Sequence, residues 1–128
     1  MNAASEMTEM SRQIVQSIYD AMASGDVKTV LELIDEDIVC YESPNLPYGR
    51  AYRGHAELQA LFEPVTKYLA IEQLKIDHLI ADGERVVAVV RLPVRSSGIE
   101  AIVAEHHLLR NGKVVEQRIF FFEPGLVR

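Results

Sequence analysis

The spacing of apolar residues changes at Tyr68, and this change limits the fold more than any other feature of the chain. Before Tyr68, apolar residues recur every three or four positions, which is typical of amphipathic helices. After it, they alternate with polar residues, which is typical of strands with one buried face. The sequence therefore predicts helices followed by a mainly antiparallel sheet, in one α+β domain over residues 1–128.

Three helices are predicted in the first half of the chain. The first covers residues 5–23, and Gly25 ends it. Asp26 suits the N-cap of a second helix. A third covers residues 54–67, with Pro64 inside it. The apolar stripe of the first helix consists of Met7, Met10, Ile14, Ile18 and Met22.

The strands are predicted from alternation and from turn residues. A short strand over residues 38–41 follows an acidic break at residues 35–37. Asn111-Gly112 is the strongest hairpin signal in the chain. The long strands are expected at residues 74–80, 86–95, 99–110 and 114–122.

The Asn111-Gly112 turn also predicts a register. Arg110 pairs with Lys113, and counting outward places His106 opposite Gln117 on the apolar face. We expect the helices to cover that face, since a sheet must bury its hydrophobic side. The opposite face then carries complementary charge pairs, Glu105 with Arg118 and His107 with Glu116, which supports the register.

Charge and composition exclude several classes of function. The net charge of −6, without a basic run, argues against binding to nucleic acid or to an anionic membrane. No apolar run approaches the roughly 20 residues of a membrane span. The N-terminus does not resemble a signal peptide, and Cys40 is the only cysteine, so we expect a cytoplasmic protein without a disulfide.

A long loop over residues 41–54 separates the helical part from the strands. Pro44 and Pro47 remove backbone donors and fix φ, so neither a helix nor a regular strand can continue through them. Loops held by rigid elements often carry binding and catalytic residues. Glu42 at the start of this loop is the best carboxylate candidate for proton abstraction, although it can equally serve to anchor the loop through backbone N–H groups.

His106 is the second candidate for proton transfer. An imidazole titrates near neutral pH and is a natural general acid or base. Gln117 opposite it can orient the ring or hold a substrate carbonyl. The alternative is a buried neutral histidine with a purely structural hydrogen bond.

Four further residues are candidates for binding a substrate, namely Ser43, Tyr48, Tyr52 and His78. The tyrosines can line the rim of a pocket or pack against their own loop. His78 lies in an apolar strand pattern whose register the Asp82-Gly83 turn leaves open. No third ligand has useful spacing to the histidines, so we expect no metal, and no motif for a cofactor is present.

The order of these elements resembles a known family. The residues that carry the resemblance are the Gly25-Asp26 turn, Tyr52-Arg53-Gly54 before a helix, and the run Asn111-Gly112-Lys113-Val114-Val115-Glu116. They resemble the SnoaL-like branch of the nuclear transport factor two-like superfamily, which includes ketosteroid isomerase, polyketide cyclases and limonene epoxide hydrolase. The resemblance implies a cone in which a curved sheet wraps around three helices and encloses an apolar pocket. It also implies a homodimer formed through the outer face of the sheet.

The catalytic residues of these relatives do not carry over directly. Ketosteroid isomerase uses an Asp base, with a Tyr and a protonated Asp as oxyanion hole. Alignment on the shared turns places these positions, and the acid of the cyclases, at Ser43, Ile18, Ala104 and Ile119. A shift of one residue brings in Glu42, Tyr19 or Glu105, but for the sheet it breaks the predicted charge pairs. The alignment therefore argues against steroid isomerisation and the cyclase mechanism.

The sequence thus predicts a protein that binds a small, largely apolar molecule in an internal pocket, with or without cofactor-free acid–base chemistry of the isomerase, cyclase or hydrolase type. His106 and Glu42 would transfer protons, and Gln117, Tyr48 and Tyr52 would position the substrate. Two alternatives remain, a ligand-binding protein without turnover and a dimeric interaction module of the same fold.

Overall fold

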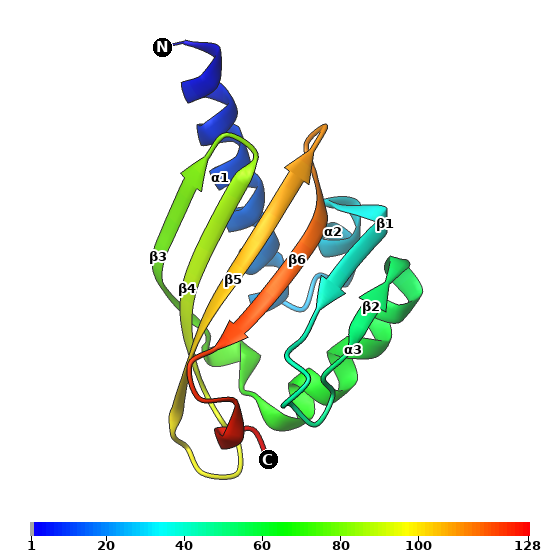
Figure 1. The fold of residues 1–128 in the computed structure, drawn as a ribbon, viewed down its shortest axis with the longest axis vertical. Coiled ribbons are helices and arrows are strands. Elements are labelled where there is room, and N and C mark those ends of the chain that lie inside the picture. Colours follow the sequence, from blue (N-terminus) through cyan, green and yellow to red (C-terminus); the bar gives the residue numbers. More distant parts are fainter. Residues whose placement is uncertain (1) are drawn as a thin grey trace.

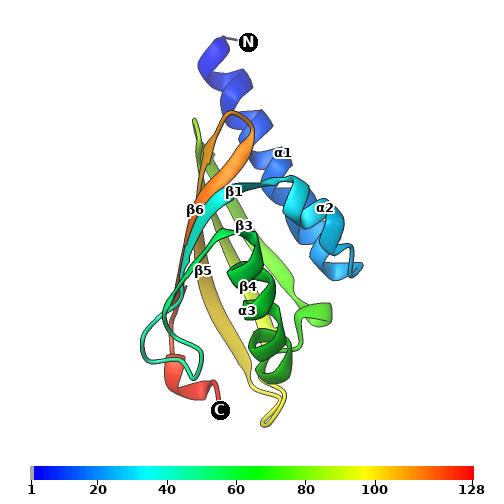
Figure 2. The ribbon, with the colours of Figure 1, turned by 90° about the vertical axis from the view of Figure 1, so that its right-hand side faces the viewer.

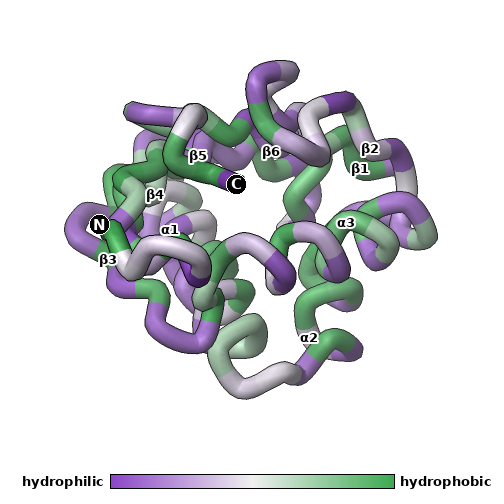
Figure 3. The backbone as a smooth tube through the Cα atoms, turned by 90° about the horizontal axis from the view of Figure 1, so that it is seen from below, coloured by the Kyte–Doolittle hydropathy of each residue, from purple (hydrophilic) through white to green (hydrophobic). Residues whose placement is uncertain are grey.

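A single sheet covered on one face by three helices makes up the structure (Figure 1). The computed structural model describes residues 2–128. Viewed from the side, the strands form one layer and all three helices lie on the same side of it (Figure 2). The view from below shows the same two layers, with α1, α2 and α3 opposite the strands (Figure 3). The predicted α+β class is confirmed.

The sheet has six strands in the order β2-β1-β6-β5-β4-β3. Neighbouring strands are antiparallel except β1 and β6, which are parallel. The elements are α1 Ala3–Ala23, α2 Val27–Glu32, β1 Ile34–Tyr41, β2 Ala51–Arg53, α3 Gly54–Tyr68, β3 Lys75–Asp82, β4 Arg85–Pro93, β5 Glu100–Arg110 and β6 Lys113–Phe121, with short 3₁₀ turns η1 Ile71–Gln73 and η2 Pro124–Leu126.

The helices begin and end where local chemistry requires. Asn2 caps α1 by accepting a hydrogen bond from the Ser5 N–H at 2.8 Å. Asp26 caps α2 as predicted, because its carboxylate accepts from the Thr29 N–H at 3.1 Å. Between the two helices Gly25 has a φ of +73°, a conformation that glycine adopts without strain.

The predicted apolar stripe of α1 is wrong at its N-terminal end. Met10 is 59% exposed and Met7 is exposed as well. The residues of α1 that are buried instead are Ser11, Val15, Ile18, Tyr19 and Ala21. Ile14, Ile18 and Met22 of the predicted stripe contact the core, and the buried face of the helix also includes Tyr19.

The acidic break at residues 35–37 lies inside β1. Ile34 pairs with Val114 of β6, but the next paired residue is Val39, opposite Glu116. The three acidic residues thus form an irregularity in the strand instead of preceding it. After them, β1 runs regularly to Tyr41 and carries Cys40 and Glu42 toward the helices at its end.

The predicted register between β5 and β6 is wrong beyond the turn. Arg110 pairs with Lys113 as expected, and Asn111 has the positive φ of +53° that such a turn requires. A register shift then lies between Leu108 and Leu109, consistent with one extra residue on β6. His107, and not His106, is therefore the partner of Gln117.

The long loop closes tightly on itself. A Cβ atom on Gly49 would lie 1.9 Å from the backbone oxygen of Ser43, so only glycine fits there. The Tyr52 hydroxyl donates to the Tyr48 carbonyl at 2.6 Å, and both rings belong to the hydrophobic core. Among the described residues, no helix has the length and apolar character needed to span a membrane.

Candidate functional site

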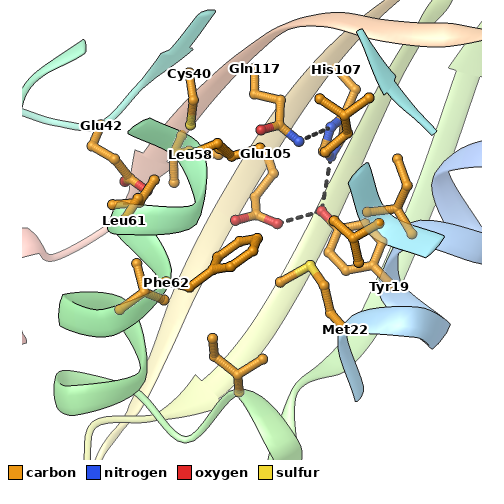
Figure 4. A pocket seen from close by; sticks show the side chains of 16 residues that line it. Tyr19, Met22, Cys40, Glu42, Leu58, Leu61, Phe62, Glu105, His107 and Gln117 are labelled. Carbon is orange, nitrogen blue, oxygen red and sulfur yellow. Dashed lines mark hydrogen bonds between the residues drawn. The ribbon is translucent and has the colours of Figure 1, made fainter. Parts of the chain in front are cut away.

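An inner pocket lies between the sheet and the helices (Figure 4). Its volume is about 80 Å³, and its lining is mostly apolar. An engineered cavity of about 150 Å³ holds a benzene ring, so this pocket accepts only a small group without movement of its walls. The polar side chains in the lining are Tyr19, Glu42, Glu105, His107 and Gln117.

Tyr19 and Glu105 meet at the centre of this pocket (Figure 4). Tyr19 comes from the buried face of α1, and Glu105 from the face of β5 that the helices cover. The tyrosine hydroxyl donates a short hydrogen bond to the Glu105 carboxylate. Burial, and then the charge of Glu105, raises the pKa of Tyr19 well above its ordinary value, so the phenol keeps its proton.

His107 continues the same hydrogen-bonded chain. Its Nε2 lies 2.9 Å from the Tyr19 hydroxyl oxygen, and its Nδ1 lies 3.2 Å from the Gln117 amide nitrogen. The imidazole packs edge-on against the Tyr19 ring, with centroids 5.8 Å apart. Its exposed fraction is 2%, and burial lowers the pKa of His107 to about 3, so the ring is neutral.

Glu42 lines the pocket from the end of β1. Its Oε1 is buried without a hydrogen-bond partner, and no other buried side-chain oxygen or nitrogen within residues 2–128 lacks one. Burial, and then the charge of Glu105, raises the pKa of Glu42 to about 8. An unpartnered carboxyl in an apolar site favours its neutral form, so Glu42 carries a proton at neutral pH.

Glu105 occupies a different environment from Glu42. Burial raises the pKa of Glu105, whereas the hydrogen bond from Tyr19 acts in the opposite direction and favours the carboxylate. Two carboxyl groups that face one small pocket cannot both ionise easily. The two carboxyl groups therefore differ in their hydrogen bonding, because Glu105 accepts from Tyr19 whereas Glu42 Oε1 has no partner.

Cys40 also lines the pocket, and it belongs to the hydrophobic core. Burial, and then the charge of Glu42, raises the pKa of its thiol above the ordinary value. A thiol without a nearby cation stays protonated and is a poor nucleophile. Cys40 therefore serves as an apolar wall of the site.

The structure places only two of the residues predicted from the sequence, Glu42 and Gln117, in the inner pocket. The expectation that His106 faces it is wrong, because the odd-numbered side chains of β5 point toward the helices. His78 does not line the inner pocket either. It is exposed on β3, next to a register irregularity between Ile76 and His78.

The loop residues lie away from the pocket too. Tyr48 and Tyr52 do not line it, because they are buried in the loop's own packing. Ser43 lines a separate hollow of about 310 Å³, together with Glu42 and Arg118. The structure therefore does not place these three residues in the lining of the inner pocket.

Three pocket residues were missed, namely Tyr19, Glu105 and His107. The alignment with the family places two catalytic positions at the residues directly before Tyr19 and Glu105. The resemblance therefore indicated these two residues to within one position. For Glu105, the predicted charge pairs disfavour the shift of one residue, because they presuppose a regular hairpin between β5 and β6. The observed outer pair is instead Arg118 with Glu116 on the same strand, at 2.6 Å.

An outer pocket adjoins the inner one near the end of α1. Its volume is about 410 Å³, and it shares Met22, Val30, Phe62 and Ile71 with the inner pocket. In Figure 4, Phe62 and Met22 lie below Glu105 and Tyr19. Within residues 2–128, no group of three or more His, Cys, Asp or Glu side chains is placed to hold a metal ion.

The comparison with protein families agrees with this geometry. The model of the SnoaL-like domain matches residues 15–117 of the chain. The protein belongs to the SnoaL-like family. The matched range includes every polar side chain of the inner pocket. Folds of this family commonly bind small molecules. No protein of curated function matches the chain.

Solved structures share the fold along nearly the whole chain. An NTF2-like protein from Burkholderia xenovorans is 28% identical, with a TM-score of 0.78 over 93% of this chain and 94% of that one. Bal32a, from a soil-derived mobile gene cassette, is 20% identical, with a TM-score of 0.81 over 95% of this chain and 99% of that one. A candidate ketosteroid isomerase from Kribbella flavida is 18% identical, with a TM-score of 0.75 over 89% and 78% of the two chains.

Proposed function

We propose that the protein binds a small, largely apolar carbonyl compound and transfers a proton on it without a cofactor. The observation that supports this most is the pair of carboxyl groups in one apolar pocket, one hydrogen-bonded and one without a partner. Environments that push two pKa values apart assign one group as acid and the other as base. Here Glu105 is the base and Glu42 is the acid.

The reaction follows from these two protonation states. The Glu105 carboxylate takes a proton from the carbon next to the carbonyl, and the C–H electrons form a C=C bond. The carbonyl π electrons move to oxygen, which takes the proton that Glu42 donates, so an enol forms. Glu105 then returns its proton to another carbon of the conjugated system and Glu42 recovers its own, which gives an isomer. Neither an oxidant nor a metal takes part in these steps.

The two pockets support an apolar substrate with a small reactive head. The inner pocket of about 80 Å³ suits a carbonyl and its neighbouring carbons. The outer pocket of about 410 Å³, between α1 and α3, suits an apolar body. The Phe62 and Met22 side chains line both pockets, so we expect them to turn aside for a substrate that occupies both.

Isomerisation of a β,γ-unsaturated cyclohexenone tests the proposal, because its conjugated product absorbs in the ultraviolet. Exchange of the protons next to the carbonyl in D₂O provides a second readout. We expect both reactions in the wild type and a loss of at least about a hundredfold in Glu105→Gln and in Glu42→Gln. Met10→Gln, on the exposed start of α1, is the control. Binding of the ketone without exchange or isomerisation would instead identify a ligand-binding protein without turnover.

A second part of the proposal concerns the outer face of the sheet, through which we propose that two copies pair. Phe120 is 57% exposed and Phe122 is 76% exposed there, beside the exposed Ile102. Exposed apolar patches of this kind mark interaction surfaces. Phe120→Glu should yield a monomer in light scattering, whereas Met10→Glu should not. A wild type that is monomeric at high concentration would contradict this part.

A further inference from the structure

Four side chains from three elements form one continuous chain of hydrogen bonds in the inner pocket. In order they are Gln117 of β6, His107 of β5, Tyr19 of α1 and Glu105 of β5 (Figure 4). The Gln117 nitrogen is 3.2 Å from His107 Nδ1, and His107 Nε2 is 2.9 Å from the Tyr19 hydroxyl. The proton transfer proposed above uses Glu105 at one end, and leaves the other end without a role.

The atoms at each link fix the direction of the chain. An amide nitrogen only donates, so His107 Nδ1 accepts from Gln117. A neutral imidazole that accepts at Nδ1 carries its proton at Nε2, which therefore donates to the Tyr19 oxygen. The single hydroxyl proton of Tyr19 is then left for Glu105. Every donor in the chain points toward the Glu105 carboxylate.

We propose that His107 and Gln117 are positioning residues that decide which of the two pocket carboxyl groups carries the negative charge. They keep the hydroxyl proton of Tyr19 directed toward the Glu105 carboxylate. This hydrogen bond keeps Glu105 ionised, so Glu42 is the carboxyl group that carries a proton. The assignment of charge stands by itself, whereas its consequence for catalysis rests on the function proposed above.

Within residues 2–128, the side chain that donates a hydrogen bond to the Glu105 carboxylate is Tyr19. Its titratable neighbours in the pocket are Tyr19 from α1, Glu42 and Cys40 from β1, and His107 on its own strand. The residues that α3 contributes are apolar, and they are Leu58, Leu61, Phe62 and Val65. Without the Tyr19 proton, Glu105 would be a buried carboxyl among apolar groups and would become neutral.

The reverse direction of the chain shows what the amide contributes. If His107 carried its proton on Nδ1, Nε2 would accept the Tyr19 proton and Glu105 would lose its donor. A carboxylate at position 117 accepts from Nδ1–H and so favours that reverse direction. Gln117→Glu keeps the size of the side chain and favours the reverse direction of the hydrogen bonds, and it also adds one ionisable carboxyl group to the pocket.

The test is an NMR titration of the purified protein with ¹⁵N-labelled histidine and ¹³C-labelled glutamate. In the wild type we expect His107 to be protonated at Nε2, and Glu105 to ionise at lower pH than Glu42. In Gln117→Glu we expect the proton of His107 to move to Nδ1 and the order of ionisation of the two glutamates to reverse. His106, on the opposite face of β5, is an internal control that should keep its signals.

Tyr19→Phe provides a second variant, because it removes the donor to Glu105 without adding a charge. It should raise the pKa of Glu105 by about one unit or more and reverse the same order. A wild-type His107 protonated at Nδ1, or an unchanged order of ionisation in Tyr19→Phe, would overturn the inference. These signals do not depend on turnover, so a failure of the ketone assay alone refutes the proposed function and leaves this assignment intact.

Discussion

Replacing Glu42 with Gln should stabilise the protein, and the gain should grow with pH. Glu42 is buried with one oxygen unpaired, and its pKa is raised from 4.5 to about 8. Because the folded pKa is the higher one, the folded state favours the protonated carboxyl. The stability that this provides is complete below about pH 4.5 and is lost as the pH rises through about 8.

The size of the effect follows from the same two values. Within this window, each pH unit lowers the free energy of unfolding by about 1.4 kcal/mol. Between about pH 5 and about pH 8, the wild type should therefore lose about 3.5 kcal/mol relative to a variant that cannot ionise at this position. That is a large part of the roughly 5 to 15 kcal/mol that stabilises a typical domain.

Urea unfolding of the wild type and Glu42→Gln at both pH values measures this difference. Any constant cost of placing an amide in the pocket cancels when the two pH values are compared. Glu63→Gln, at an exposed position of α3, is the control and should change stability little at either pH. An equal gain for Glu42→Gln at both pH values would refute the argument, since it would mean that Glu42 is ionised in the folded protein.

Three further predictions concern other parts of the fold. Asp26→Ala should lower the free energy of unfolding in urea by about 1 kcal/mol, since it removes the cap of α2. Asp26→Asn should keep most of this stabilisation, because an Asn side chain can also cap the helix. Gly49→Ala should lower stability by more than this, because its methyl group would overlap the Ser43 carbonyl; a wild-type melting temperature would contradict the described loop. Phe62→Ala should speed the isomerisation of bulky ketones more than that of the small cyclohexenone, and equal effects on both would show that Phe62 does not separate the two pockets.

The sequence was sufficient where the information is local. The change of period at Tyr68 correctly separates α3 from strands β3 to β6, because burial of one face imposes a period of 3.6 or 2, whereas β2 lies within the predicted loop. Asp26 and the Asn111-Gly112 turn were predicted correctly for the same reason, since a cap and a tight turn depend on a few neighbouring atoms. The resemblance to the SnoaL-like family was also right.

The site itself depended on tertiary structure. Side chains alternate along a strand, so a shift of one residue moves each of them to the other face. The irregularity beside Leu108 does this, and it brings His107 and Glu105 into the pocket in place of His106. Nothing in the local pattern of β6 marks that extra residue. Likewise, the packing of α1 against the sheet, and not its apolar periodicity, turns Tyr19 toward Glu105, because the sheet covers only part of the helix. The types of element thus depend on neighbouring residues in the sequence. Which side chains meet in the pocket depends on how distant elements pack against each other.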